Sequence, residues 1–229
     1  MMIRSVIVVM VTLIAGTCLA DQALTIADRE FEFGKVPQNS TVRHQFWMHS
    51  TGSDTLRIEK VVTGCTCTIM PLEKDWLAPG DSMPAVVWWD IERRVGKIGR
   101  YPKIHYDSDL SPTRMSLTGT AMQHPDSARP IRVSPYKFEL SRTQTIDLDS
   151  LEFRVDNTSS EDMILQILSY PVEECDYYVP DTIPAGQSAR GFIRVKPEYS
   201  ESEFKSSITI QAVGDDDSRL SIPIRRRFF

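Results

Sequence analysis

Short apolar segments alternate with turn-forming residues along the whole chain. The segments are rich in valine, isoleucine, threonine and aromatic residues, and glycine, proline, aspartate, asparagine or serine interrupts them about every 8 to 12 residues. This pattern is typical of an all-β sandwich, and no long segment has the period of a helix. In the first half the segments predict strands over residues 30–34, 41–49, 56–63, 65–70, 83–90, 101–106 and 114–119. About seven strands suit one immunoglobulin-like domain.

The second half of the chain repeats the first at an offset of about 106 residues. Residues 49–56 align with 156–163, where a hairpin turn leads into an apolar strand, and residues 77–82 align with 183–188. Two copies of one fold explain such a self-match better than one large domain does. We therefore predict two tandem immunoglobulin-like β-sandwich domains.

A polar stretch with two prolines, residues 123–130, separates the two copies. Such a composition marks a short, semi-extended linker rather than a flexible tether. We predict a first domain over residues 21–123, a linker over 124–130 and a second domain over 131–229.

Residues 1–20 have the features of a signal peptide. Arg4 supplies a positive charge, residues 6–14 form an apolar run, and the small residues Cys18 and Ala20 precede the expected cleavage site. The apolar run is too short for a membrane-spanning helix, which needs about 20 residues, and no later segment approaches that length. We therefore expect an exported protein, in the periplasm or at the cell surface, without a membrane span. A lipid anchor at Cys18 is the alternative.

The composition is that of an ordinary globular protein, with 41% hydrophobic and 25% charged residues. The formal net charge of −5 makes the chain mildly acidic. Nucleic acids select basic surfaces, so this charge gives no reason to expect a nucleic-acid partner.

The cysteines are the densest reactive chemistry in the chain. Cys65, Cys67 and Cys175 remain after the expected cleavage, and three cysteines cannot all pair within one chain. If residues 65–67 are extended, both sulfurs lie on the same face of a strand, with their Cα atoms about 6.6 Å apart. A disulfide spans about 4.4 to 6.8 Å between Cα atoms, so a local bond requires a bend or a bulge.

Three interpretations of Cys65 and Cys67 stay open. Free cysteine is among the most buried residue types, so the pair can fill a sheet core. Thiolates select soft metal ions, which makes the two residues candidate ligands for Cu(I), although two ligands alone do not complete a site. The third interpretation is a redox-active pair, or a disulfide with Cys175. The second copy keeps only Cys175 in the corresponding region, which favours a task specific to the first domain.

Two adjacent tryptophans are candidates for binding. Trp88 and Trp89 lie in a predicted strand, so one side chain faces the core and the other faces the opposite side. An outward indole stacks on a sugar, docks a partner or is covered by the neighbouring domain, and the sequence leaves these alternatives open.

The loop that follows the tryptophans is also a binding candidate. It carries Arg93 and Arg94, whereas the matching loop of the second copy carries Glu198, Glu201 and Glu203. Where two loops of opposite charge meet, between domains or between molecules, they mainly determine how the two surfaces align and how fast they associate. The alternative is that both loops are simply solvated.

Four segments of the first half carry a family resemblance. They read Phe-Glu-Phe-Gly-Lys-Val at 31–36, Cys-Thr-Cys-Thr at 65–68, Leu-Ala-Pro-Gly-Asp-Ser at 77–82 and Leu-Thr-Gly at 117–119. These segments resemble the DUF1573 family of bacterial immunoglobulin-like domains, whose cysteine motif usually has a glycine where Thr66 stands here. The resemblance implies an exported, non-catalytic β-sandwich of about seven strands. The second domain resembles the family only through its repeat relation to the first.

The sequence thus predicts an exported, non-catalytic binding or structural module of unidentified ligand. No Ser-His-Asp triad, paired-carboxylate site or nucleotide-binding loop is readable, so we expect neither an enzyme nor a resident cofactor. The expected partner is a protein or another cell-envelope component. The alternative function is Cu(I) binding or thiol redox chemistry at Cys65 and Cys67.

Overall fold

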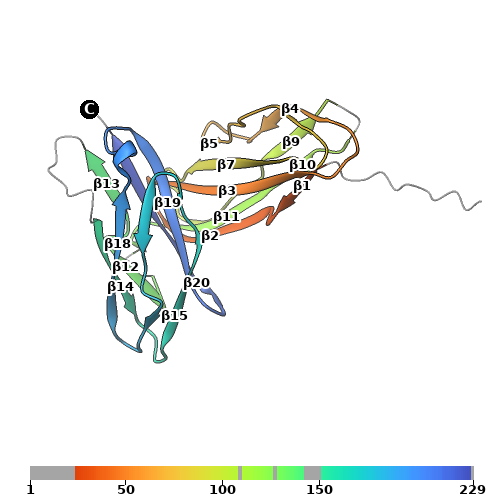
Figure 1. Ribbon diagram of the computed structural model, residues 1–229. Coiled ribbons are helices and arrows are strands. Elements are labelled where there is room, and N and C mark those ends of the chain that lie inside the picture. The colour runs from red at the N-terminus through yellow and green to blue at the C-terminus, as the bar shows by residue number, and fades with distance from the viewer. Residues whose placement is uncertain (1–23, 108–109, 126–127, 142–150, 228–229) are drawn as a thin grey trace, which may run out of the picture.

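The computed structural model describes residues 24–107, 110–125, 128–141 and 151–227 (Figure 1). The predicted signal peptide and the candidate lipid anchor at Cys18 lie outside the described residues. Across the described ranges the protein is all-β, as the sequence predicts, and the short 3₁₀ helix η2 (Pro197–Tyr199) follows β18. In this part of the chain no helix is long and apolar enough to cross a membrane.

The first half of the chain folds as a β-sandwich. Its strands are β1 (Leu24–Ala27), β2 (Glu30–Pro37), β3 (Thr41–Ser50), β4 (Leu56–Val62), β5 (Thr68–Ile69), β6 (Trp76–Leu77), β7 (Ser82–Asp90), β8 (Gly96–Arg100), β9 (Lys103–Tyr106), β10 (Thr113–Arg114) and β11 (Ser116–Met122). Two four-stranded sheets have the orders β1-β3-β7-β5 and β10-β9-β4-β6, while β2, β11 and β8 belong to a larger sheet. Phe33, Phe46 and Trp89 are among the largest fully buried side chains of the core that these strands enclose.

Strand β7 illustrates how the geometry of a strand fills this core. Met83, Ala85, Val87 and Trp89 are buried, whereas the residues between them are partly or fully exposed. Successive side chains of a strand point to opposite faces, so one face of β7 is fully buried although Val86 and Trp88 on the other face are also apolar.

The second half forms a sandwich of its own. Its strands are β12 (Ile131–Ser134), β13 (Phe138–Ser141), β14 (Leu151–Asn157), β15 (Met163–Ser169), β16 (Cys175–Tyr178), β17 (Thr182–Ile183), β18 (Ser188–Val195), β19 (Phe204–Ala212) and β20 (Asp215–Arg227). The sheet β12-β14-β18-β16 has the same order as β1-β3-β7-β5, and β13 runs parallel to β20 as β2 runs parallel to β11. This correspondence supports the predicted repeat. The repeat and the domain boundaries stay predictions.

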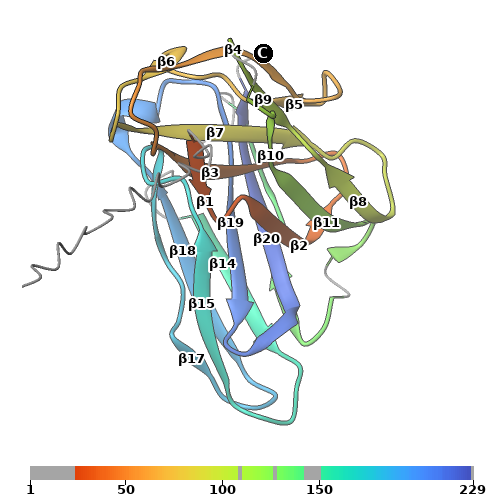
Figure 2. The same cartoon turned by 90° about the vertical axis from the view of Figure 1, so that its right-hand side faces the viewer.

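A single sheet joins the two halves. Its order is β17-β15-β19-β20-β2-β11-β8, and β20 of the second half pairs in parallel with β2 of the first at Lys35 and Leu220. Figure 2 shows β20 running beside β2 at this junction. Each half has its own hydrophobic core, and Leu168 of β15 in the second half also packs against the core of the first.

Buried polar groups tie the halves together beside the shared sheet. The backbone N–H of Arg43 donates to Ser207 Oγ over 2.9 Å, and His44 Nδ1 lies 2.9 Å from Ser169 Oγ. The hydroxyl of Ser221 donates to the carbonyl of Phe33 over 2.7 Å. Since buried polar groups that find partners act as geometric constraints, these bonds fix the angle between the halves.

The structure differs from two predicted strands. The strand predicted at 65–70 contains only Thr68–Ile69, because the chain turns through the cysteines before it pairs with β7. The strand predicted at 101–106 begins at Lys103, and β8 (Gly96–Arg100) precedes it without having been predicted. β8 is charged and only partly buried, so it lacks the apolar alternation on which the prediction relied.

Candidate functional site

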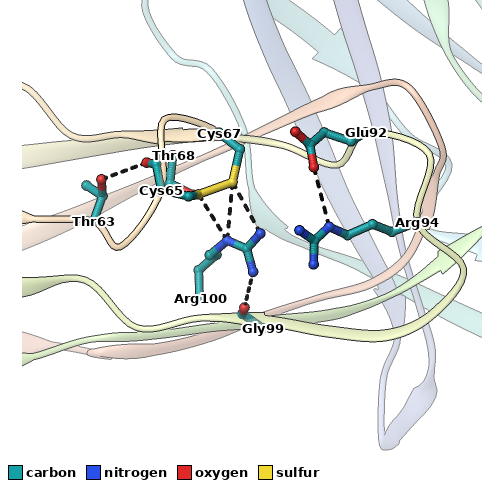
Figure 3. The surroundings of a disulfide bond; sticks show 8 residues. All are labelled: Thr63, Cys65, Cys67, Thr68, Glu92, Arg94, Gly99 and Arg100. Atoms are coloured by element: carbon teal, nitrogen blue, oxygen red, sulfur yellow. Dashed lines mark hydrogen bonds and ion pairs between the residues drawn. A yellow bond between two sulfur atoms is a disulfide. The ribbon is translucent and has the colours of Figure 1, made fainter.

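Cys65 and Cys67 form a disulfide in the loop between β4 and β5. Their Cα atoms lie 5.2 Å apart, which is closer than an extended segment allows, and the turn at this position supplies the bend that a local bond requires. Gly64, with a φ of 83°, enters the turn in a conformation that other residues rarely adopt. The hydroxyl of Thr63 donates to the carbonyl of Cys65 over 3.1 Å and holds the loop (Figure 3).

The side chain of Arg100, at the end of β8, points at this disulfide (Figure 3). Its Nε lies 3.2 Å from Cys65 Sγ and 3.3 Å from Cys67 Sγ, and its Nη2 lies 3.2 Å from Cys67 Sγ. The guanidinium also packs over the ring of Trp89, 5.6 Å from the ring centre, and donates from Nη1 to the carbonyl of Gly99 over 2.8 Å. Among the described residues it forms no ion pair with a carboxylate.

Arg100 therefore brings a positive charge to the two sulfurs. Burial, together with the charge of Arg94, lowers the pKa of the Arg100 guanidinium from its ordinary value. An arginine stays protonated in proteins at neutral pH even so, because its ordinary pKa lies far above neutral pH. The sulfurs thus face a cation whose charge no described carboxylate neutralises at contact distance.

Cys175 is separate from this site. Its thiol is free and buried in the core of the second half, so the disulfide with Cys175 that the sequence left open does not form. Burial raises the pKa of the Cys175 thiol to about 12, and the carboxylates of Glu174 and Asp176 add to the shift. A buried thiol that does not ionise is chemically inert.

A groove of about 780 Å³ lies between the two halves, beside the disulfide. The first half contributes Cys67 and Trp88 to its wall, and the second contributes Tyr199, Phe204 and Lys205. The full lining comprises Thr66, Cys67, Ile69, Pro71, Trp88, Asp90, Glu174, Tyr199, Ser202, Glu203, Phe204, Lys205, Arg225, Arg226 and Arg227. Its size is in the range of ligand-binding clefts, about 300 to 1,000 Å³.

The groove combines an aromatic wall with charged groups. Trp88 Nε1 donates to the carbonyl of Lys205 over 2.9 Å, and Lys205 Nζ lies 3.4 Å from Asp90 Oδ2 across the groove. Glu174 is buried, and its Oε2 has no hydrogen-bond partner among the described residues. Burial raises the pKa of Glu174, and the nearby guanidinium of Arg43 partly opposes that shift. Arg225 Nε likewise lacks a partner within the described ranges, so an acceptor and a donor are both unsatisfied here.

The predicted site residues separate in the structure. Cys67 and Trp88 meet in the groove, whereas Trp89 is fully buried in the first core, where its ring packs against Phe33. Arg93 and Arg94 are exposed on the loop between β7 and β8, outside the groove lining, and Arg94 pairs with Glu92 over 3.4 Å.

The candidate Cu(I) site remains a prediction. As a disulfide, Cys65 and Cys67 offer no thiolate, so binding of Cu(I) would require prior reduction. Within the described ranges, no group of three or more histidine, cysteine, aspartate or glutamate side chains is arranged to hold a metal ion.

Sequence reasoning missed the groove residues of the second half and Arg100. Tyr199, Phe204 and Arg225 are separated along the chain and lie in no common motif. Arg100 is one of several cations after β7, and only the pairing of β8 with β11 directs it to the disulfide. The sequence shows several basic residues after β7, but it does not show which of them contacts the two cysteines.

The fold and the site together define a class of protein. It is an all-β protein of two sandwiches joined by one sheet, with a disulfide loop beside the groove between them. Residues 24–121 match the family model described as "Protein of unknown function (DUF1573)", as the sequence resemblance predicts.

Other comparisons add little beyond the fold. No curated protein matches the sequence significantly. Among solved structures, the PapD-like domain 7 of human CEP192 matches with a TM-score of 0.39 and 9% identity, covering 52% of this chain and 99% of its own. A protein of unknown function from Porphyromonas gingivalis W83 matches with a TM-score of 0.36 and 10% identity over 90% of this chain and 99% of its own. These similarities are too low to bear on function.

Proposed function

We propose that this protein is an exported, non-catalytic binding module, located in the periplasm or at the cell surface, which holds a polypeptide partner in the groove between its two sandwiches. The observation that carries the proposal is the groove itself, whose walls come from both halves and carry three aromatic side chains, Trp88, Tyr199 and Phe204. Aromatic side chains of this kind dominate the energetics of protein interfaces.

The walls of the groove are held in place by the shared sheet. The pairing of β20 with β2 joins the halves in one sheet, and the bond from Trp88 to Lys205 crosses between the halves at the groove. A pre-organised site avoids part of the entropy cost of binding, because its side chains are already ordered. A rigid junction therefore supports a binding role.

The polar groups of the groove favour a polypeptide over a purely apolar ligand. The unsatisfied Oε2 of Glu174 requires a donor, and the unsatisfied Nε of Arg225 requires an acceptor. A peptide backbone carries both kinds of group on every residue except proline. Leaving such buried groups unpaired is costly, so a ligand that satisfies them gains affinity.

Site-directed photo-crosslinking tests the proposal. We expect a photo-reactive amino acid in place of Ile69, which lines the groove, to give a defined adduct with a partner in cells that express the protein. The same amino acid in place of Ile164 is the matched control, because both isoleucines are 57% exposed and Ile164 lies outside the groove lining. Equal adducts from both positions, or none from position 69, would refute a partner in the groove.

The alternative function at Cys65 and Cys67 divides into two chemistries. A guanidinium beside both sulfurs opposes the binding of a second cation, whereas it favours the release of a thiolate. The contact with Arg100 therefore supports thiol redox chemistry over Cu(I) binding.

A further inference from the structure

We propose that the Cys65–Cys67 disulfide exchanges with the thiols of a substrate that reaches it through the groove, and that Arg100 stabilises the thiolates that this exchange releases. The proposal goes beyond a binding role and relies on the groove only as the route of the substrate. The substrate is either a polypeptide with a cysteine or a small molecule, and in both cases the reacting group is a thiol.

The disulfide contributes little to the fold. A disulfide stabilises a protein mainly by restricting the unfolded chain, and the effect grows with the length of the loop that it closes. This bond encloses a single residue, Thr66, so its loop is close to the shortest that a disulfide can close. The bond lies in a turn at the surface of the groove and is not needed to hold two strands together.

The position of Arg100 has an electrostatic consequence for reduction. A disulfide is neutral, whereas a reduced cysteine pair can carry a negative charge. Because Arg100 Nε lies within 3.3 Å of both sulfurs, either sulfur that leaves as a thiolate forms next to a cation. Hydrogen bonds from a charged donor to a charged acceptor are about twice as strong as neutral ones. Arg100 therefore stabilises the reduced state more than the oxidised state.

The groove determines which sulfur is approached. Cys67 and the exposed Thr66 belong to its lining, whereas Cys65 does not. A substrate thiolate in the groove therefore meets Cys67 first. Cys65, on the far side of the bond, is the leaving group and lies 3.2 Å from Arg100 Nε.

The exchange balances with two substrate thiols. The first substrate thiolate attacks Cys67 Sγ, the bond between Cys65 and Cys67 breaks, and Cys65 leaves as a thiolate. The second substrate thiolate attacks the substrate sulfur of this mixed disulfide, and Cys67 leaves as a thiolate. The substrate becomes a disulfide and gives two electrons to the protein. The two thiol protons pass to solvent or to the reduced cysteines.

Equilibration of the full mature protein with reduced and oxidised glutathione tests the proposal. Two molecules of reduced glutathione should convert the native disulfide to a dithiol, with release of one oxidised glutathione, under conditions in which stable structural disulfides stay oxidised. Alkylation followed by mass spectrometry counts the reduced cysteines, and circular dichroism verifies that the fold is retained. A native disulfide that stays oxidised throughout would overturn the proposal without recourse to any variant.

Substitution of Arg100 tests the role assigned to it. In Arg100→Gln, loss of the charged hydrogen bonds should shift the equilibrium with glutathione about tenfold toward the disulfide. Arg100→Lys, which keeps the charge, should recover part of that shift. Arg94→Gln is the matched control, because Arg94 pairs with Glu92 and does not contact the sulfurs (Figure 3). Equal equilibrium constants in Arg100→Gln, Arg94→Gln and the parent would overturn the role of Arg100.

A second comparison identifies the source of the thiol. We expect Phe204→Ala, which removes an aromatic wall of the groove, to slow exchange with a reduced unfolded polypeptide at least about fivefold more than it slows exchange with glutathione. That result assigns the site to polypeptide thiols. If Phe204→Ala affects exchange with both probes equally, the site is assigned to small thiols. If the exchange persists although position 69 gives no crosslinked partner, the binding function is refuted and the present proposal stands.

Discussion

Gly34 of the first half lies directly against the backbone of Arg219 in the second. A Cβ atom placed on Gly34 would lie 2.1 Å from the carbonyl oxygen of Arg219, and Gly34 also has a φ of 64°. Any side chain at this position would collide with backbone, which cannot rotate away as a side chain can. The close approach of β2 and β20 therefore depends on this glycine.

We expect Gly34→Ala to destabilise the junction of the two halves by at least about 2 kcal/mol, because it adds backbone strain and a steric clash. Denaturant unfolding measures the loss. Gly186→Ala is the matched control, since Gly186 has a φ of 66° and its Cβ would have no neighbour within 4 Å. Equal losses in the two variants would show that the contact with Arg219 is not limiting.

His44 makes the stability of the junction depend on pH. Its ring stacks on Phe31 with centres 3.6 Å apart, and burial, assisted by the charge of Arg43, lowers the pKa of His44 to about 3. In the unfolded chain this pKa returns to about 6.5. Between these values the unfolded state binds more protons, so stability falls as the pH falls from about 6.5 toward 3.

The expected slope is up to about 1.4 kcal/mol per pH unit from this residue. Unfolding free energies of the parent and of His44→Gln between pH 7 and 4 measure it, and the variant should lose most of the slope. His49→Gln, at an exposed position, should retain it. If His44→Gln keeps the slope of the parent, other groups produce the acid sensitivity.

Trp88 connects the two halves through its indole N–H. Trp88→Phe removes the bond to the carbonyl of Lys205, and we expect a loss of about 1 kcal/mol in unfolding free energy. The partner adduct from position 69 should also weaken, because the aromatic wall changes. Trp47→Phe is the control, since Trp47 is 47% exposed. A smaller effect in Trp88→Phe than in Trp47→Phe would contradict the assigned role.

The reactivity of the cysteines should differ sharply. Thiol titration of the oxidised mature protein should find no reactive thiol in the native state and one, Cys175, after denaturation. Cys175→Ser should cost about 1 to 3 kcal/mol in stability, because it places a hydroxyl in an apolar core. If the native parent reacts immediately with the thiol reagent and the variant Cys175→Ser does not, the Cys175 thiol is accessible.

A Cu(I) titration against a competing chelator separates the two chemistries of the cysteine pair. We expect the oxidised protein to bind no copper and the reduced protein to bind it weakly, since only two thiolates are available beside a guanidinium. The variant Cys65→Ser is the control for specific ligation. Tight stoichiometric binding by the reduced parent, lost in Cys65→Ser, would move the function to metal handling.

The fold class follows from local properties of the sequence. Strand β11 buries Leu117 and Ala121 and leaves Ser116, Thr118 and Thr120 partly exposed, because apolar and polar residues alternate along it, and this alternation is visible without any structure. The resemblance of residues 65–68 and 77–82 to the DUF1573 family is also local, and the match to residues 24–121 confirms it. The alternation of apolar and polar residues and the positions of turn residues are local properties, so they determine strands without reference to distant parts of the chain.

The local conformation of the cysteines was only partly predictable. The sequence shows that an extended 65–67 segment holds the sulfurs at the limit of a disulfide, and it requires a bend for a bond. It does not show whether the chain bends, because the apolar pattern at 65–70 also suits a strand. In the structure β5 is shortened to Thr68–Ile69, and Cys65 pairs with Cys67.

The site itself was decided by tertiary structure. Arg100 reaches the disulfide because β8 pairs with β11, and Tyr199 and Phe204 share a groove with Cys67 because the second half packs against the first there, with Trp88 bonded to Lys205. These pairings join segments far apart in the chain, and they depend on contacts such as that between Gly34 and Arg219. The sequence by itself therefore determined the two sandwiches and the cysteine motif. Only the long-range packing of one sandwich against the other produced the groove and its charges.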